Sequence, residues 1–288
     1  MDMNQRVGVI IPYFSHWPFF EEMFHSLLNQ SYDNWEAIVI NDSGMPLTSD
    51  RVSQVCSDSR ITLLENELNL GLARTWNRGA DLLLQRGVDI IAVVHADDVL
   101  HRDFLLHSSK AHQRHPGCAI VHTAVSVIRD DGRLTVTLRD TVKRLNRPRS
   151  RNGEFLTSGD RGLAKLLRAN YIFCPTISYK STLLSGHFFN EDLKMVLDLD
   201  VTTRLLLSGE QFVGLTKRLY RYRRHSSSLT ARYTNDASRF EEEEALYSRV
   251  ALRSREVGFL RSAIVARRRV IIRAHKLTRA IGVLVRYN

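Results

Sequence analysis

Two carboxylates, Asp97 and Asp98, directly follow an apolar run in the middle of the chain. Residues 88–94 of that run are rich in β-branched side chains, which predicts a strand buried on both faces of a parallel sheet. The carboxyl end of such a strand is where open α/β sheets bind ligands. Adjacent carboxylates repel each other, so a site that keeps both ionised supplies a cation, and carboxylate oxygens favour Mg²⁺ or Mn²⁺. The alternative is a polar turn after a core strand, with Asp98 capping the next helix.

Two other expected strands also end in residues that stop a strand or could bind a ligand. The apolar run 7–11 is followed by Pro12 and Tyr13, and the run 35–40 is followed closely by Asp42. Because the carboxyl ends of parallel strands meet at one edge of a sheet, we expect these residues and the two adjacent acids to line one crevice.

Helical patterns separate these strands. Apolar residues recur at helical spacing over 18–29, and a second helix is expected to open within 69–79 and to stop at Gly87. A short strand over 60–64 lies between the two helices. Strand and helix alternate in this way in α/β proteins, so we expect a doubly wound, mostly parallel sheet.

The second half of the chain begins with a helix expected over 101–115 and a hairpin whose strands span 119–128 and 134–138. Residues 141–153 then show no apolar period and carry five cations, which predicts a solvated, mobile loop. A second interpretation is a lid whose cations meet a phosphate-bearing substrate or a membrane surface.

After this basic loop the sequence again predicts regular secondary structure, with a helix near 160–169 and a strand near 176–179. The stretch 190–200 leads into a helix that ends near Gly209. In that helix Asp198 and Asp200 point apart, because residues two positions apart do not share a face, and Asp200 is expected to turn toward Arg204. Two short strands, 212–215 and 219–222, and a Ser-rich loop follow.

Composition limits the classes of protein that fit. The chain has 288 residues and a net charge of +10, with 43% hydrophobic residues, as in an ordinary globular protein. Three scattered cysteines suit a reducing compartment, and neither a signal peptide nor a transmembrane run is expected. Residues 261–288 contain eight Lys and Arg but no acid, and 270–285 has one apolar helical face. Such a basic amphipathic tail indicates an anionic partner or a packed helix.

Taken in order, several short motifs resemble the family-2 glycosyltransferases, which are inverting enzymes of the GT-A fold. The resemblance covers residues 7–230. The motifs that carry it are Val9-Ile10-Ile11-Pro12-Tyr13-Phe14, Ser26-Leu27-Leu28-Asn29-Gln30-Ser31-Tyr32, Val39-Ile40-Asn41-Asp42-Ser43-Gly44, Asn69-x-Gly71-x-x-Arg74-x-x-Asn77-x-Gly79, Ala96-Asp97-Asp98, Asp198-x-Asp200-x-x-x-Arg204 and Tyr222-Arg223-Arg224-His225.

The resemblance implies a role for eight residues, each toward a nucleotide-sugar donor, a divalent metal or the acceptor hydroxyl. Its implications for the donor are that Pro12 and Tyr13 line the base pocket, Asp42 contacts the base or ribose, Arg74 reaches the base or diphosphate, and Asp97 contacts the ribose. It further implies that Asp98 binds Mn²⁺ or Mg²⁺, that His225 approaches the metal or diphosphate, and that Asp198 is the catalytic base.

This sequence departs from the family pattern at three positions. His95 and Asn41 stand where the family often has an acid, and Leu197 replaces the acid that often precedes the base. The last departure leaves Asp192 or Glu191 as alternatives to Asp198.

The sequence therefore predicts an inverting, metal-assisted glycosyltransferase that takes a nucleotide sugar, most simply a UDP-sugar. We expect a glycosyltransferase domain over 1–232 and a basic helical region over 233–288. A glycan or lipid-linked acceptor and a cytoplasmic site, peripheral on the inner face of a membrane, complete the hypothesis. The alternative is a non-catalytic nucleic-acid-binding protein that uses the basic tail, although no motif of that class is visible. A nucleotidyltransferase is disfavoured because no Gly-rich loop follows the first strand.

Overall fold

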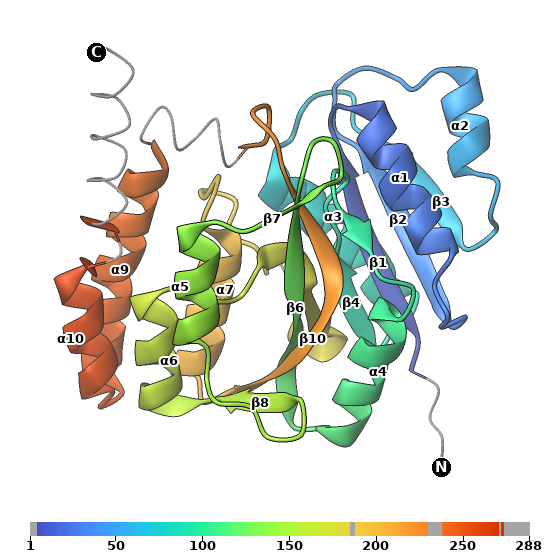
Figure 1. The fold of residues 1–288 in the computed structure, drawn as a ribbon. Coiled ribbons are helices and arrows are strands. Elements are labelled where there is room, and N and C mark those ends of the chain that lie inside the picture. Colours follow the sequence, from blue (N-terminus) through green and yellow to red (C-terminus); the bar gives the residue numbers. More distant parts are fainter. Residues whose placement is uncertain (1–4, 185–187, 230–237, 271, 274–288) are drawn as a thin grey trace.

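A mixed β-sheet organises the chain in a computed structural model that describes residues 5–184, 188–229, 238–270 and 272–273. Figure 1 shows helices on both faces of this sheet. The strand order is β3-β2-β1-β4-β9-β6-β10-β5, with β7 beside β6 and β8 beside β10.

The first four strands form the predicted parallel half of the sheet. Helices cross between them, so each connection returns the chain to the same edge. Every residue of β2 is buried, as expected for a β-branched strand covered on both faces. The elements are β1 (Val7–Tyr13), α1 (Trp17–Leu28), β2 (Trp35–Asn41), α2 (Ser49–Val55), β3 (Ile61–Glu65), α3 (Leu72–Gln85) and β4 (Ile90–Val93).

Beyond β4 the sheet is mixed. β9 runs antiparallel to both β4 and β6, while β6 and β10 are parallel to each other. The elements are β5 (Val99–Leu100), α4 (Phe104–Arg114), β6 (Cys118–Arg129), β7 (Leu134–Thr135), α5 (Leu138–Asn146), β8 (Glu154–Thr157), α6 (Gly159–Arg168), β9 (Ile177–Lys180), α7 (Leu197–Leu207) and β10 (Gln211–Arg224), with 3-10 turns η1 (Cys174–Thr176) and η2 (Ser181–Leu183).

Three expectations for this half are wrong. The two short strands expected over 212–215 and 219–222 are one strand, β10, whose register shifts between Leu215 and Arg218. The first half of the loop expected over 141–153 belongs to α5, and the strand expected over 134–138 ends at Thr135. The helix begins with a capping box in which Thr137 and Asp140 each accept the other's backbone N–H. The polar composition of this segment concealed that local start signal.

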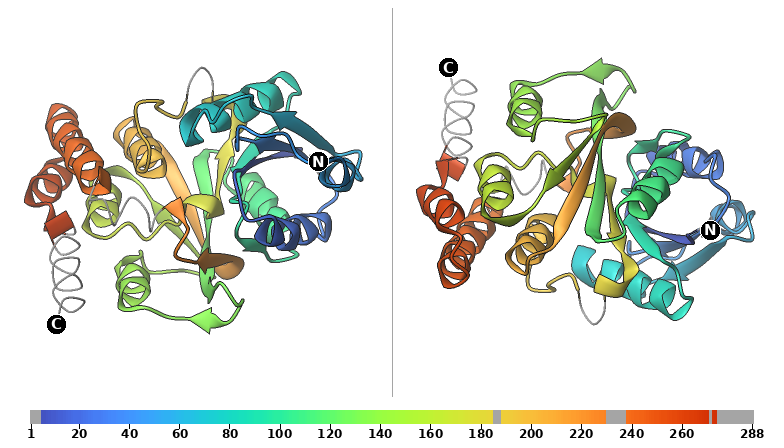
Figure 2. Two further views of the ribbon diagram at one scale, coloured as in Figure 1. Left: turned by 90° about the horizontal axis from the view of Figure 1, so that it is seen from above. Right: turned by 90° about the horizontal axis from the view of Figure 1, so that it is seen from below.

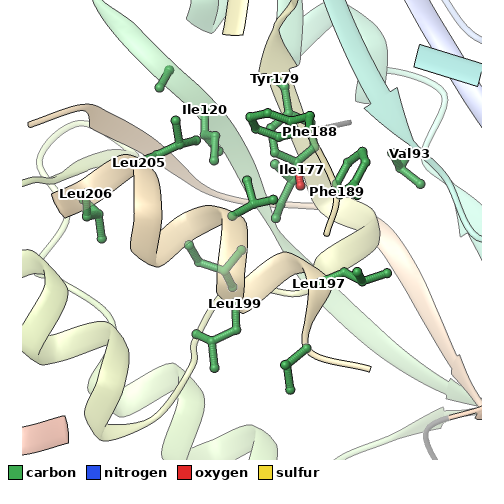
Figure 3. Packing of buried hydrophobic residues seen from close by; sticks show 14 of the residues in the cluster. Val93, Ile120, Ile177, Tyr179, Phe188, Phe189, Leu197, Leu199, Leu205 and Leu206 are labelled. Carbon is green, nitrogen blue, oxygen red and sulfur yellow. The ribbon is translucent and has the colours of Figure 1, made fainter. Parts of the chain in front are cut away.

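The sheet separates two clusters of buried side chains. Along β1, Val9 and Ile11 belong to one cluster and Ile10 to the other, because successive residues of a strand face opposite sides. Figure 3 shows the cluster on which α7 rests. Its labelled members are Val93, Ile120, Ile177, Tyr179, Phe188, Phe189, Leu197, Leu199, Leu205 and Leu206.

Close packing of α3 on β1 explains a glycine of the Asn-x-Gly motif. A Cβ added at Gly79 would lie 2.8 Å from Cγ2 of Ile10, which is closer than carbon atoms tolerate. The helix therefore approaches the sheet at a distance that only glycine allows at this position.

The C-terminal helices α9 (Ser238–Glu256) and α10 (Leu260–Arg268) extend the layer formed by α6 and α7 (Figure 2). Buried Phe240 and Tyr247 belong to the same core cluster as α7, and the Tyr247 hydroxyl donates to the Leu167 carbonyl at 2.8 Å. No helix among the described residues is long and apolar enough to cross a membrane. Most of the expected amphipathic helix over 270–285 lies outside the described residues.

Candidate active site

Asp98 is fully buried at the turn that follows β4. Its Oδ1 accepts the backbone N–H of Arg223 at 2.7 Å, and the Tyr220 hydroxyl lies close to the carboxyl group, whereas the buried Oδ2 makes no hydrogen bond of standard geometry among the described residues. Burial and then the neighbouring charge of Asp97 raise the pKa of Asp98 well above its usual range. A buried carboxyl group of this kind either holds a proton or requires a cation.

Asp97 has a different environment from its neighbour. Its Oδ2 lies 2.8 Å from Nε2 of His225. Burial acts to raise the pKa of Asp97, but the His225 hydrogen bond and the charges of His95 and His225 outweigh it, and the net shift is downward. The two adjacent acids thus differ in proton affinity, with Asp97 held as the carboxylate.

His95 completes a group of three residues whose ligand atoms could meet one metal ion. One ligand atom each from His95, Asp97 and Asp98 lies within 4.8 Å of the others, and Nδ1 of His95 is 3.9 Å from Oδ2 of Asp98. Burial lowers the pKa of His95, which favours the neutral imidazole that binds metals. Because the buried Oδ2 of Asp98 belongs to this group, the residues present fit a divalent cation. His225 instead contacts Asp97, and its role as a metal ligand stays a prediction.

Arg223 is a buried arginine, with a side chain 1% exposed. It holds in place the turn that carries Asp97 and Asp98, which we call the acidic turn. Its Nε donates to the Asp97 carbonyl at 2.7 Å, and its terminal nitrogen pairs with Glu22 on α1. The guanidinium also lies 4.5 Å from the centre of the Phe19 ring. The sequence placed Arg223 in a motif but gave it no role, because its partners are 93 or more residues away.

Asp198 lies in the first turn of α7, close enough to the acidic turn for its charge to act on His95. Asp200 turns away, as predicted, and its Oδ2 pairs with Nε of Arg204 at 2.8 Å. The apolar residues of α7 in Figure 3 anchor the helix on the core and so orient this first turn.

Asp42 holds together the loop that precedes α3. Its two carboxylate oxygens accept four N–H groups at 2.7–3.3 Å. The donors are the side chains of Asn66 and Asn69 and the backbones of Leu70 and Gly71. The resemblance implies that Asp42 contacts a base or ribose, and this role stays a prediction. Within the protein, the Asp42 carboxylate already binds the loop before α3.

The two residues expected to line the base pocket, Pro12 and Tyr13, lie at the end of β1, where the Tyr13 carbonyl accepts the Asp42 N–H at 2.7 Å. Tyr13 is 5% exposed, and its ring packs edge-on against Trp17 and Phe20, so most of it belongs to the core. Pro12 precedes it and is half-buried. The role of both in a base pocket stays a prediction.

Arg74 extends from α3 with a side chain 62% exposed, and its Nε pairs with Glu191 at 3.1 Å. One turn later Asn77 donates to the Phe189 carbonyl at 2.9 Å and accepts the Phe189 N–H at 3.0 Å. This motif therefore connects α3 to the segment that leads into α7 and Asp198.

A hollow of about 600 Å³ lies on the other side of α7, between residues 188–192 and α9. Neither Asp97 nor Asp98 lines it. Its three arginines, Arg204, Arg249 and Arg253, all pair with carboxylates. This hollow is thus separate from the acidic turn.

Comparison with known proteins gives a consistent result. The model of the family described as glycosyl transferase family 2 matches residues 8–169. An uncharacterized glycosyltransferase of Haemophilus influenzae is 35% identical over 80 residues, which are 27% of this chain and 25% of that protein. TuaG of Bacillus subtilis, assigned as a teichuronic acid biosynthesis glycosyltransferase, is 26% identical over 226 residues, or 78% of this chain and 81% of that one.

Among solved structures, TarS 1–349 of S. aureus superposes with a TM-score of 0.62 at 17% identity, covering 86% of this chain and 65% of that one. Its complexes with UDP and with UDP-GlcNAc give the same TM-score. The likeness to TarS shows the fold, with the mostly parallel central sheet and flanking helices. The chain spans a quarter of the Haemophilus relative and about two thirds of the TarS fragment.

Proposed function

Because the chain belongs to glycosyl transferase family 2, we propose that it transfers a sugar from a nucleoside-diphosphate donor to a hydroxyl acceptor, with inversion. One observation carries the proposal. Asp98, whose Oδ2 is buried, lies beside Asp97 at the carboxyl end of β4, where the charge of Asp198 also reaches. Such a site suits a divalent cation that is bound jointly by carboxylates and by the diphosphate of the donor.

A UDP-sugar is the donor that we propose. Two complexes of TarS, the solved structure with the same fold, contain UDP and UDP-GlcNAc. In this chain we assign Asp97 to the ribose and Arg74 to the base or diphosphate, while Pro12, Tyr13 and Asp42 form the base side of the pocket.

We propose that Mn²⁺ or Mg²⁺ binds at Asp98, with His95 and Asp97 as the further donors within reach. When bound, a divalent cation neutralises negative charge that develops on the leaving diphosphate. Arg223 then has a definite role, because its backbone N–H holds the Asp98 carboxylate and its side chain holds the backbone carbonyl of Asp97.

Asp198 is the proposed general base. The acceptor hydroxyl oxygen forms a bond to the anomeric carbon, the bond from that carbon to the diphosphate oxygen breaks, and the hydroxyl proton passes to the Asp198 carboxylate. One carboxylate opposite the leaving group suffices for this single displacement. Glu191 is less suited to the role because its carboxylate pairs with Arg74 and lies 3.3 Å from Nδ2 of Asn77.

The acceptor that we propose is a glycan or lipid-linked glycan, and the proposed location is cytoplasmic, peripheral on a membrane. This proposal depends on the basic sequence of residues 261–288. Since α10 packs on α6 and α9, deletion of residues 274–288 is a cleaner test than deletion from 261. Equal sedimentation of both forms with anionic vesicles would contradict a role for the segment beyond 273.

The proposed domain boundary, between residues 232 and 233, falls outside the described residues. The described helices beyond it, α9 and α10, pack on α6 and α7 as a C-terminal extension of the domain.

Single-turnover transfer from a UDP-sugar panel tests the base directly. Asp198→Asn should lower the transfer rate about 10²–10⁴-fold while the affinity for UDP stays within twofold of the wild-type value. Asp192→Asn and Glu191→Gln are the matched controls. If either control loses the rate while Asp198→Asn retains it, the assignment of the base is wrong.

A further inference from the structure

A small hollow between α6 and α10 is lined almost entirely by cations. Its volume is about 430 Å³, and its lining residues are Arg161, Ala164, Lys165, Arg168 and Arg261. Three of the cations lie on one face of α6, at positions i, i+4 and i+7, and the fourth comes from α10, about 100 residues later in the chain. Figures 1 and 2 show these two helices side by side, at the end of the molecule away from the parallel strands.

No acidic side chain is among the described residues that line this hollow. Among the described residues, no carboxylate forms an ion pair with the side chain of Arg161, Lys165 or Arg168. Asp160, at the start of α6, accepts the backbone N–H groups of Arg261 and Ser262 at 3.0 and 2.7 Å, and the charge of Arg261 helps to lower its pKa. The hollow behind α7 differs, because each of its arginines is paired.

Like charges that converge without a counterion destabilise a fold unless an anion joins them. The packing of α10 on α6 brings Arg261 to the other three cations, and buried Ala164 occupies little space among them. Guanidinium and ammonium groups arranged around the small side chain of Ala164 suit a phosphate group, because phosphate accepts several charge-assisted hydrogen bonds at once.

The exposed face of α10 indicates that this phosphate is attached to an apolar chain. Leu260 and Ile264 are 65% and 52% exposed, and Ile264 lies one turn from Arg261 on the same side of the helix. Exposed aliphatic side chains beside cations are typical of helices that lie at a membrane interface. A free anion would make no use of them.

We propose that the α6–α10 hollow binds the phosphate of an anionic phospholipid headgroup, with Leu260 and Ile264 against the acyl region. The site is remote from the acidic turn and does not depend on the proposed reaction, so either assignment can fail alone. It also does not involve the segment beyond residue 273.

Co-sedimentation with phosphatidylglycerol vesicles tests the site in the full-length chain. Lys165→Gln and Arg168→Gln should each weaken vesicle binding about fivefold, because each cation near an anionic surface contributes about that factor. Lys110→Gln, an exposed lysine on α4 with the same change of charge, is the matched control and should bind as the wild type does. Phosphatidylcholine vesicles should bind none of the proteins, and inorganic phosphate should compete for the wild type more strongly than chloride at equal ionic strength.

Several results would overturn the proposal. An equal loss in Lys110→Gln would mean that net charge alone drives binding, and full binding by both hollow variants would place any lipid contact elsewhere. If phosphate raised the melting temperature of the wild type and the control but not of the hollow variants, while vesicles bound none of them, the ligand would be a free phosphate. Circular dichroism of each variant identifies any loss that follows from unfolding.

Discussion

Nε2 of His225 lies 2.8 Å from Oδ2 of Asp97, although 128 residues separate them along the chain. The contact joins the end of β10 to the turn after β4, and Nδ1 of His225 faces the Ser227 hydroxyl at 2.8 Å. The end of β10, with its Arg-Arg-His segment, is therefore bound directly to the acidic turn after β4. The position of Asp97 depends on this histidine as well as on its own turn.

Replacement of His225 should therefore weaken nucleotide binding through Asp97. We expect His225→Ala to lower the affinity for UDP with Mn²⁺ about tenfold or more, because a charged hydrogen bond at a partly buried carboxylate is lost. His225→Gln can still donate an amide N–H to Asp97 and should recover part of the loss, as measured by isothermal titration. His25→Ala, at an exposed position on α1, is the control. Equal loss in the Ala and Gln variants would favour direct ligation of the metal by His225 instead.

Asp42 should contribute more to the free energy of unfolding than an exposed aspartate does. In Asp42→Asn an amide N–H₂ would face two of the donors that now share the carboxylate, so we expect a loss of about 2–4 kcal/mol in the free energy of unfolding. Urea denaturation measures it, with the exposed Asp81→Asn on α3 as the control. A loss no larger than that of the control would show that the loop before α3 does not depend on Asp42.

Two buried histidines should make the fold sensitive to acid. Burial lowers the pKa of His112 to about 4 and of His122 to about 3, against about 6.5 in an unfolded chain. Between these values the unfolded state binds protons that the folded state does not. The free energy of unfolding should thus fall as pH drops below about 6.5, by about 1.4 kcal/mol per pH unit for each histidine.

His122 allows this effect to be separated from other titrations. Its Nε2 has no hydrogen-bond partner among the described residues, and the ring packs against Phe155 and Tyr171. His122→Leu should therefore keep near wild-type stability at pH 7 and reduce the acid slope by about 1.4 kcal/mol per pH unit, measured by urea denaturation from pH 7 to 4. An unchanged slope would mean that His122 is not buried as the neutral ring.

His95 should affect which metal the acidic turn prefers. An imidazole donor favours Mn²⁺ over Mg²⁺ more than an all-oxygen set does, since Mg²⁺ strongly prefers oxygen ligands. We expect His95→Asp to lower the ratio of Mn²⁺ to Mg²⁺ affinity severalfold, as read from electron paramagnetic resonance of Mn²⁺ displaced by Mg²⁺. His25→Asp, at an exposed position on α1, is the control. An unchanged ratio in His95→Asp would remove His95 from the ligand set.

Local sequence predicted the parallel half of the sheet because each part of it has a local signal. The apolar run that ends at Asp97 and Asp98 is one example, and outside this half the i, i+4 spacing that turns Asp200 toward Arg204 is another local signal. Arg223 could not be assigned in this way, since its bonds to the acidic turn cross 125 residues or more. The start of α5 did have a local signal, Thr137 with Asp140, but the surrounding cations obscured it. Contacts between distant strand ends follow from the sheet order, which periodicity does not contain.

Titration of UDP into the protein by calorimetry, with Mn²⁺ and then with EDTA, tests the donor site most directly. GDP, CDP and dTDP serve as competitors, and Asp98→Asn as the variant, whose side chain can still accept the Arg223 N–H. We predict that UDP binds the wild type with Mn²⁺ and that both EDTA and Asp98→Asn abolish binding, while the variant melts no lower than the wild type. Failure of the wild type to bind any of the four nucleotides, or UDP binding that neither EDTA nor Asp98→Asn reduces, would contradict the assignment of the acidic turn as the donor site.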